Sequence, residues 1–89
     1  MKAVLLQTIV GPVETVNMQM IVDLPCVVFG GMGMVVGGDS KIVSAVAYNV
    51  DNGLLCVVFD VIGLRGVESL FLECVQEHLD RGWLVGGSL

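Results

Sequence analysis

Residues 41–62 read as a β-hairpin, and this segment constrains the fold more than any other. Two runs rich in β-branched residues, KIVSAVAYNV and LLCVVFDVI, flank the tripeptide Asp51-Asn52-Gly53. Asn-Gly is a preferred pair for a two-residue type I′ turn, because both central residues of that turn need positive φ. With Asn52 and Gly53 at the centre of the turn, the sequence predicts a register that begins with Asp51 opposite Leu54.

This predicted register sorts the hairpin side chains onto two faces, and both faces are largely apolar. One is a full core face, to which we assign the helix described below: Val46, Tyr48, Val50, Leu55, Val57, Phe59 and Val61. The other face is small and mixed; besides Asn49 and Asp60 it holds Val43, Ala45, Ala47, Cys56, Val58 and Ile62. Small apolar residues suit a face that packs against a second sheet about 10 Å away. That sheet would come from residues 3–36 or from another copy of the chain, and we expect a homo-oligomer, most simply a dimer.

The composition also indicates more apolar surface than a small domain can bury. Apolar residues make up 55% of the chain, and 18 of its 89 residues are Val. A chain of this size buries only about 60–65% of its unfolded surface, so the surplus goes to an oligomer interface, a ligand cavity or a membrane. The membrane is least favoured: the longest uncharged stretch, residues 24–38, contains Pro25 and five Gly, and a spanning helix needs about 20 apolar residues.

Charge and cysteine usage narrow the partners and the compartment. The net charge is −5 with four Lys and Arg, which disfavours nucleic acid and anionic membrane surfaces but leaves a basic target protein open. The three cysteines are odd in number and widely spaced, without a CxxC pair, so neither a disulfide scaffold nor a zinc site is indicated. We expect free thiols in a reducing cytoplasm, and no metal or other cofactor.

The remaining pattern predicts one α+β domain over residues 1–89. Residues 3–10 and 15–24 read as strands, and residues 26–36 as one bent strand or two short strands hinged at Gly30-Gly31. Apolar residues at i, i+3 and i+4 spacing predict a helix from about residue 67 to residue 80, followed by a short strand at 83–85 and a Gly-Gly-Ser-Leu tail. The predicted architecture is an antiparallel sheet of about five to six strands with one C-terminal amphipathic helix on one face.

Two groups on the predicted helix raise the question of catalysis. Cys74 and His78 are four residues apart, a spacing that brings a thiol and an imidazole together as nucleophile and base. No third, orienting residue is identifiable, and a partly buried core histidine is the alternative interpretation. Glu73 and Glu77 share the same spacing, but helices routinely carry such pairs on their solvated face. No catalytic residue is therefore predicted, and a small enzyme that uses Cys74 or His78 remains an alternative.

Glycine-rich segments raise the question of anion binding. The segment Gly30-Gly31-Met32-Gly33 lacks the full G-x-G-x-x-G pattern, and the loop from Gly37 to Lys41 lacks the order of a P-loop. Backbone N–H groups in such a loop can still cradle an anion that a nearby cation neutralises. A flexible turn is the alternative. The candidate ligand site consists of Gly37, Gly38, Ser40, Lys41 and Arg65.

The C-terminal quarter, VESLFLECVQEHLDRGWLVGG, resembles the end of several small uncharacterised bacterial and phage domains. In those domains an amphipathic helix closes with Gly-Trp and leads into a last strand; here Gly82-Trp83 and the residues that follow carry the likeness. The resemblance implies a small non-enzymatic α+β module with Trp83 packed where the helix meets the sheet. It supplies no site residues.

These observations together predict a small, acidic, cytoplasmic, non-enzymatic binding or inhibitory protein that acts as a homo-oligomer. It would block a partner protein, from a host or otherwise, or sequester a small ligand between subunits. A structural module whose self-association is its function is the first alternative, and the Cys74/His78 enzyme is the second.

Overall fold

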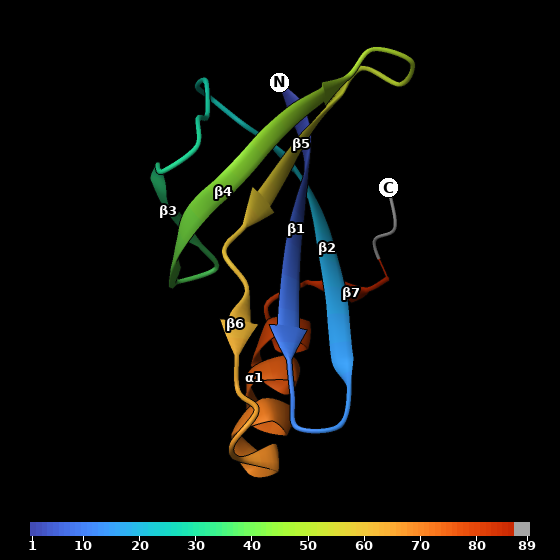
Figure 1. The fold of residues 1–89 in the computed structure, drawn as a ribbon. Helices are drawn as coiled ribbons and strands as arrows, with labels where there is room; N and C mark the ends of the chain where they lie inside the picture. The colour runs from blue at the N-terminus through green and yellow to red at the C-terminus, as the bar shows by residue number, and fades with distance from the viewer. Residues whose placement is uncertain (87–89) are drawn as a thin grey trace.

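The computed structural model describes residues 1–86, which form a sheet-rich α+β fold with seven strands and one helix (Figure 1). The strands lie in the order β3-β4-β5-β1-β2-β7, and β6 pairs with β1 further along the same edge as β5. In chain order the elements are β1 (Lys2–Val10), β2 (Thr15–Asp23), β3 (Gly33–Val36), β4 (Asp39–Asn49), β5 (Leu54–Phe59), β6 (Ile62–Gly63), α1 (Glu68–Asp80) and β7 (Leu84–Val85). The C-terminal tail beyond Gly86 lies outside the described residues.

The sheet is mostly antiparallel, but its central strand is not. β1 is antiparallel to β2 and runs parallel to β5 and to β6. The prediction of an antiparallel sheet is therefore right for most strand pairs and wrong at β1. Strands buried on both faces carry continuous apolar runs rather than alternating ones, and β1 shows this pattern because the adjacent residues Val4 and Leu5 are both buried.

The turn chemistry of the two hairpins differs from the prediction. Four residues, 50–53, connect β4 to β5, and the Gly53 N–H donates to the carbonyl of Asn49 (2.9 Å). Gly53 has φ +70° whereas Asn52 has no positive φ, so the predicted type I′ turn is wrong. The Asn52 side chain instead accepts from the N–H of Leu54 (3.0 Å). A two-residue turn with positive φ at both positions occurs between β3 and β4, at Gly37-Gly38 (+59° and +91°).

The longer loop moves the β4–β5 register by two residues, so that Asn49, not Asp51, pairs with Leu54. A shift of two leaves each side chain on its predicted face, because strand side chains alternate with period two. The assignment of residues 45–49 and 54–59 to faces therefore holds although the predicted pairs are wrong. The expectation of a full core face is wrong for Tyr48, Val50 and Val61, which are 55%, 82% and 59% exposed.

A β-bulge at Ser44 places the side chains of the first half of β4 on the opposite face from the one predicted. Val43 pairs with Phe59 whereas Ala45 pairs with Val58, so one extra residue stands on β4 between the two pairs. Bulges re-aim the side chains that precede them. Val43, expected on the small mixed face, lies in the core with 1% of its surface exposed, and Lys41, two residues before it, also points inward.

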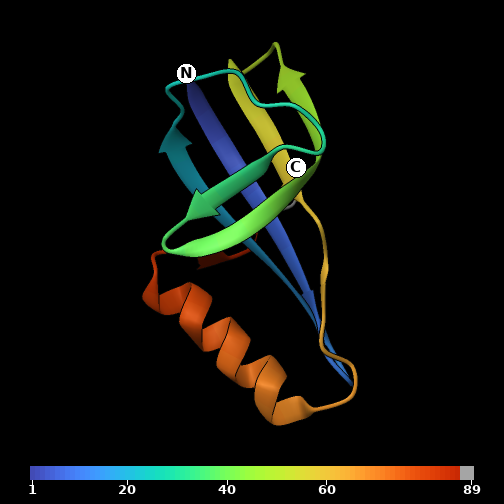
Figure 2. The same ribbon diagram turned by 90° about the vertical axis from the view of Figure 1, so that its left-hand side faces the viewer.

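The core lies on the side of β1 and β2 that faces β3, β4 and α1. Figure 2 shows β3 and β4 crossing β1 and β2, with α1 beside the opposite end of β1. The largest fully buried apolar side chains come from β1, β2, β4, β5, α1 and the residue before β7: Leu5, Ile9, Met18, Val43, Val57, Phe59, Phe71 and Trp83. Residues 26–36 supply a strand only in their last four residues, preceded by a turn at Gly30-Gly31.

The helix matches its predicted bounds closely. It ends at Asp80, and Gly82 follows with φ +96°, the left-handed conformation typical of the residue after a helix. Phe71 and His78 are its buried residues, whereas Leu70 and Leu79 on the predicted apolar stripe are partly exposed. No helix within residues 1–86 has the length and apolar content needed to span a bilayer.

Candidate functional site

Three buried polar side chains meet inside the fold. Gln7 of β1, Lys41 of β4 and His78 of α1 are 2%, 7% and 3% exposed, and they are the buried polar residues of the described chain. The Lys41 Nζ donates to Gln7 Oε1 (2.9 Å) and lies 2.9 Å from His78 Nε2. Gln7 Nε2 in turn donates to the backbone carbonyl of Asp60 (2.9 Å). We call these three residues the Lys41 cluster.

The hydrogen bonds assign the histidine tautomer. His78 Nδ1 lies 2.8 Å from the carbonyl oxygen of Cys74, which can only accept, so Nδ1 carries a proton. Nε2 is then the unprotonated nitrogen and accepts a hydrogen bond from the Lys41 amine. Nε2 is the ring nitrogen that points at the lysine.

The Lys41 amine lies near aromatic rings and not near a carboxylate. Nζ lies 5.3 Å from the centroid of the Trp83 ring and 5.9 Å from that of Phe59, within the range of cation–π attraction. The nearest acidic residue in sequence, Asp39, forms an ion pair with Arg81 near the surface. Burial lowers the pKa of Lys41 from its ordinary value, and the negative charge of Asp39 only partly opposes this effect.

Cys74 does not have the surroundings of a reactive thiol. Its Sγ lies 3.8 Å from His78 Nδ1, so the predicted proximity exists, but that nitrogen already donates to a carbonyl. Burial raises the pKa of Cys74, which keeps the thiol protonated, whereas nucleophilic cysteines have lowered pKa values. Across residues 1–86, no three His, Cys, Asp or Glu side chains gather as metal ligands would.

A cavity of about 210 Å³ adjoins the Lys41 cluster. It lies where β4 and the segment leading into β6 separate, beyond the hydrogen bond from the Asp60 N–H to the Ile42 carbonyl (2.9 Å). Its lining consists of Gln7, Ser40, Lys41, Ile42, Asp60, Val61 and Ile62. The cluster is therefore buried but next to a space that a small molecule can fill.

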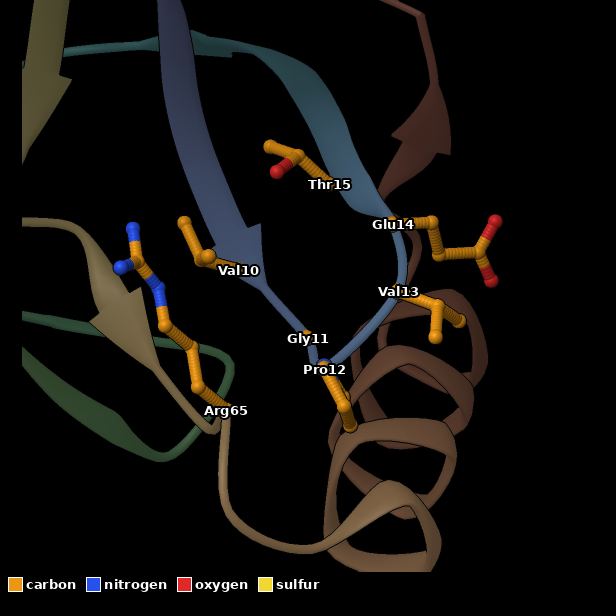
Figure 3. A pocket seen from close by; sticks show the side chains of 7 residues that line it. All are labelled: Val10, Gly11, Pro12, Val13, Glu14, Thr15 and Arg65. Atoms are coloured by element: carbon orange, nitrogen blue, oxygen red, sulfur yellow. The ribbon is translucent and has the colours of Figure 1, made fainter.

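The five residues predicted to bind a ligand do not form one site. Gly37 and Gly38 form the β3–β4 turn beside Arg81, and Ser40 and Lys41 line the cavity described above. Arg65 belongs to a different, shallow depression of about 400 Å³ around the β1–β2 turn. Figure 3 shows its side chain beside Val10, with the Glu14 carboxylate directed away from it. An anion site that combines the glycine loop with Arg65 is not formed.

The other side of the sheet presents an uncharged apolar surface, the outer patch. Registers across four strands align Ala47, Cys56, Val4 and Ile21 in one row and Ala45, Val58, Leu6 and Gln19 in the next. Ile21, Ala45 and Ala47 are exposed, whereas Val4 and Cys56 in the middle of the patch are buried by their neighbours. Figure 1 shows no described element in front of these strands. A depression of about 220 Å³ beside Val4 and Cys56 indents this patch.

The structure brings together four of the six residues predicted to form an interface. Ala45, Ala47, Cys56 and Val58 lie in the outer patch, whereas Val43 lies in the core because of the bulge. Ile62 pairs with the fully buried Ile9 and packs against the core from the inner side. Sequence reasoning missed the contribution of Val4, Leu6 and Ile21, because the sequence of the hairpin does not show that β5 pairs with β1.

Sequence reasoning also missed the Lys41 cluster as a unit. Two signals were present: Gln7 is the one amide in the apolar run of β1, and Lys41 opens a β-branched strand. Without knowledge of the bulge, the sequence does not show that these two side chains point to the same side of the sheet.

Comparisons with known protein families, with curated proteins and with solved structures found no match for this chain. Its function is therefore argued from the geometry alone.

Proposed function

We propose that the protein is a small acidic binding protein, without catalytic activity, that acts as a homodimer through the outer patch. The observation that carries this proposal is the four-strand apolar surface, which holds no ionisable side chain except the buried thiol of Cys56. Contiguous exposed apolar surface on a small protein marks an interaction site. In this proposal α1 covers the inner face, so the outer face is the one left for a partner.

Charge restricts where a second copy of the chain can dock. The net charge of −5 makes two copies repel, so contact is least unfavourable over a surface free of charge. A twofold axis through the patch brings the small residues Ala45 and Ala47 of one copy toward the larger side chains of the other. Small residues allow the close approach that face-to-face sheet packing needs.

The size of the patch suits the core of such an interface. Four strands about 4.8 Å apart and three residues about 3.3 Å apart along each strand span about 200 Å², roughly a quarter of the area that one partner contributes to a standard interface. The polar side chains of Thr8, Asn17, Asn49 and Asn52 and the charged pair Lys2 and Asp23 border the patch and are available for the polar rim that interfaces carry.

Binding of a small ligand between subunits fits the same arrangement. The depression beside Val4 and Cys56 opens onto the outer patch, and a second copy would close it. Blocking of a partner protein would use the same apolar surface in place of the second copy.

Sedimentation equilibrium across a range of concentrations tests the proposal. The wild-type chain is expected to sediment as a dimer, and Ala47→Glu as a folded monomer, because a charge is buried without a partner in the interface. Ser69→Glu, at an exposed position of α1, adds the same charge elsewhere and should stay dimeric. A monomeric wild-type chain at high concentration, or a dimeric Ala47→Glu, would overturn the proposal.

A further inference from the structure

The Lys41 cluster combines three features that a purely structural lysine does not need. Its amine is buried without a contacting carboxylate in the described chain and lies 2.9 Å from His78 Nε2, and Lys41 and its hydrogen-bond partner Gln7 both line a cavity of about 210 Å³. We propose that Lys41 is a reversible covalent binding site that captures a small neutral aldehyde or ketone as an imine.

The surrounding groups fit each proton transfer of that step. His78 Nε2 accepts a proton from the Lys41 ammonium, and the free amine then adds to the carbonyl carbon to give a carbinolamine. The C–O bond breaks and the oxygen leaves as water with the proton that His78 returns. The product is a protonated imine, so one water is released and the net charge at Lys41 is unchanged.

The other members of the cluster hold the amine for this reaction. Gln7 Oε1 accepts one N–H of Lys41, and Gln7 itself is fixed by its hydrogen bonds to the carbonyls of Asp60 and Thr8. The Trp83 and Phe59 rings stabilise a positive charge at Nζ, which the protonated imine retains. Burial, which lowers the pKa of Lys41, increases the fraction of free amine near neutral pH.

The cavity limits the ligand. Its volume corresponds to about seven water molecules, which admits a carbonyl compound of a few carbon atoms. Three of the lining residues are apolar, Ile42, Val61 and Ile62, and Asp60 is the acidic residue among them. This lining favours a neutral compound over an anionic keto acid. The site lies on the inner side of the sheet and does not depend on the dimer.

Reductive trapping tests the proposal with an internal control. The chain has two lysines, Lys2 and Lys41, and Lys2 is exposed. The folded protein is treated with propanal and cyanoborohydride at pH 7, and peptide mapping by mass spectrometry gives the alkylation rate at each lysine. We expect Lys41 to react faster than Lys2, because burial lowers the pKa of Lys41 and leaves more of its amine unprotonated. In strong urea this preference should disappear.

Two variants separate reactivity from accessibility. His78→Leu should slow the reaction at Lys41 while leaving the rate at Lys2 unchanged, because His78 acts as a positioning residue and proton acceptor. Lys41→Arg should react at Lys2 and the N-terminus alone. Reaction of Lys41 no faster than Lys2 in the folded wild-type chain, or equal rates at Lys41 with and without His78, would overturn the proposal.

Discussion

The two faces of the central sheet are built from similar residues and end in opposite environments. The inner face lies behind β3 and β4 and holds a buried lysine, with Phe71 and His78 of α1 buried beside it. The outer face carries almost no charge and has no described element in front of it. One extra residue, Ser44, decides which face Lys41 and Val43 join. The contrast shows that residue type alone does not tell which apolar surface is a core and which is an interface.

The largest expected effect concerns the helix side of the inner face. Phe71→Ala should lower the free energy of unfolding by about 3–5 kcal/mol, because it removes a fully buried ring from the core. Leu70→Ala, one residue earlier and half exposed, is the matched control and should change it by less than about 1 kcal/mol. Urea denaturation measures both. Equal losses would show that α1 does not close the inner face as described.

Adjacent valines of β5 compare the two faces directly. Val57 is fully buried on the inner face and Val58 lies on the outer one. Val57→Ala should cost about 2–3 kcal/mol of stability at any protein concentration. Val58→Ala should cost less in dilute solution and more as the concentration rises, since it weakens a dimer that stabilises the fold by mass action. Concentration-independent losses at both positions would contradict the two-face account.

Close backbone approach at the end of β1 gives a smaller effect. A Cβ added at Gly11 would lie 2.6 Å from Cδ1 of Phe71, so Gly11→Ala should destabilise by about 1–3 kcal/mol through overpacking. Gly63→Ala, where a Cβ meets nothing within 4 Å, is the control. In the Phe71→Ala background the Gly11 penalty should vanish. Its persistence there would mean that another contact causes it.

The pH dependence of stability should report the buried amine. Because the folded pKa of Lys41 is below its ordinary 10.5, the unfolded chain binds more protons between these two values, and stability rises with pH in that window. The raised pKa of Cys74 opposes this above pH 9.0, where the folded chain retains its proton. In Cys74→Ala, the free energy of unfolding should therefore rise as the pH approaches 10.5 from below, and adding Lys41→Met should flatten the curve. Parallel curves would contradict the lowered pKa of Lys41.

Local patterns predicted the elements well because their determinants are local. The alternation in β2, the i, i+3, i+4 spacing of α1 and the glycine at position 82 each act within a few residues. The hairpin faces were also predictable, since an error of two residues in register preserves them.

Long-range features of the fold were not predictable from this one sequence. The parallel pairing of β1 with β5 joins residues about fifty positions apart, and no local propensity specifies it. The bulge at Ser44 depends on how β4 bends over the core, and the Lys41 cluster depends on that bulge. The sequence therefore singled out Lys41 and His78 separately, Lys41 in the glycine-rich loop and His78 beside Cys74, and did not predict that they are in contact.

The central claim, that a second copy covers the outer patch, is tested most directly by isotope-filtered NOE spectroscopy. A mixture of labelled and unlabelled chains reports contacts between subunits alone. The account predicts intersubunit NOEs from the methyl groups of Ala47, Val58 and Ile21 and none from the buried Val57 or Val43. Intersubunit NOEs confined to α1 or to β7, or none at a concentration where the mass is that of a dimer, would contradict it.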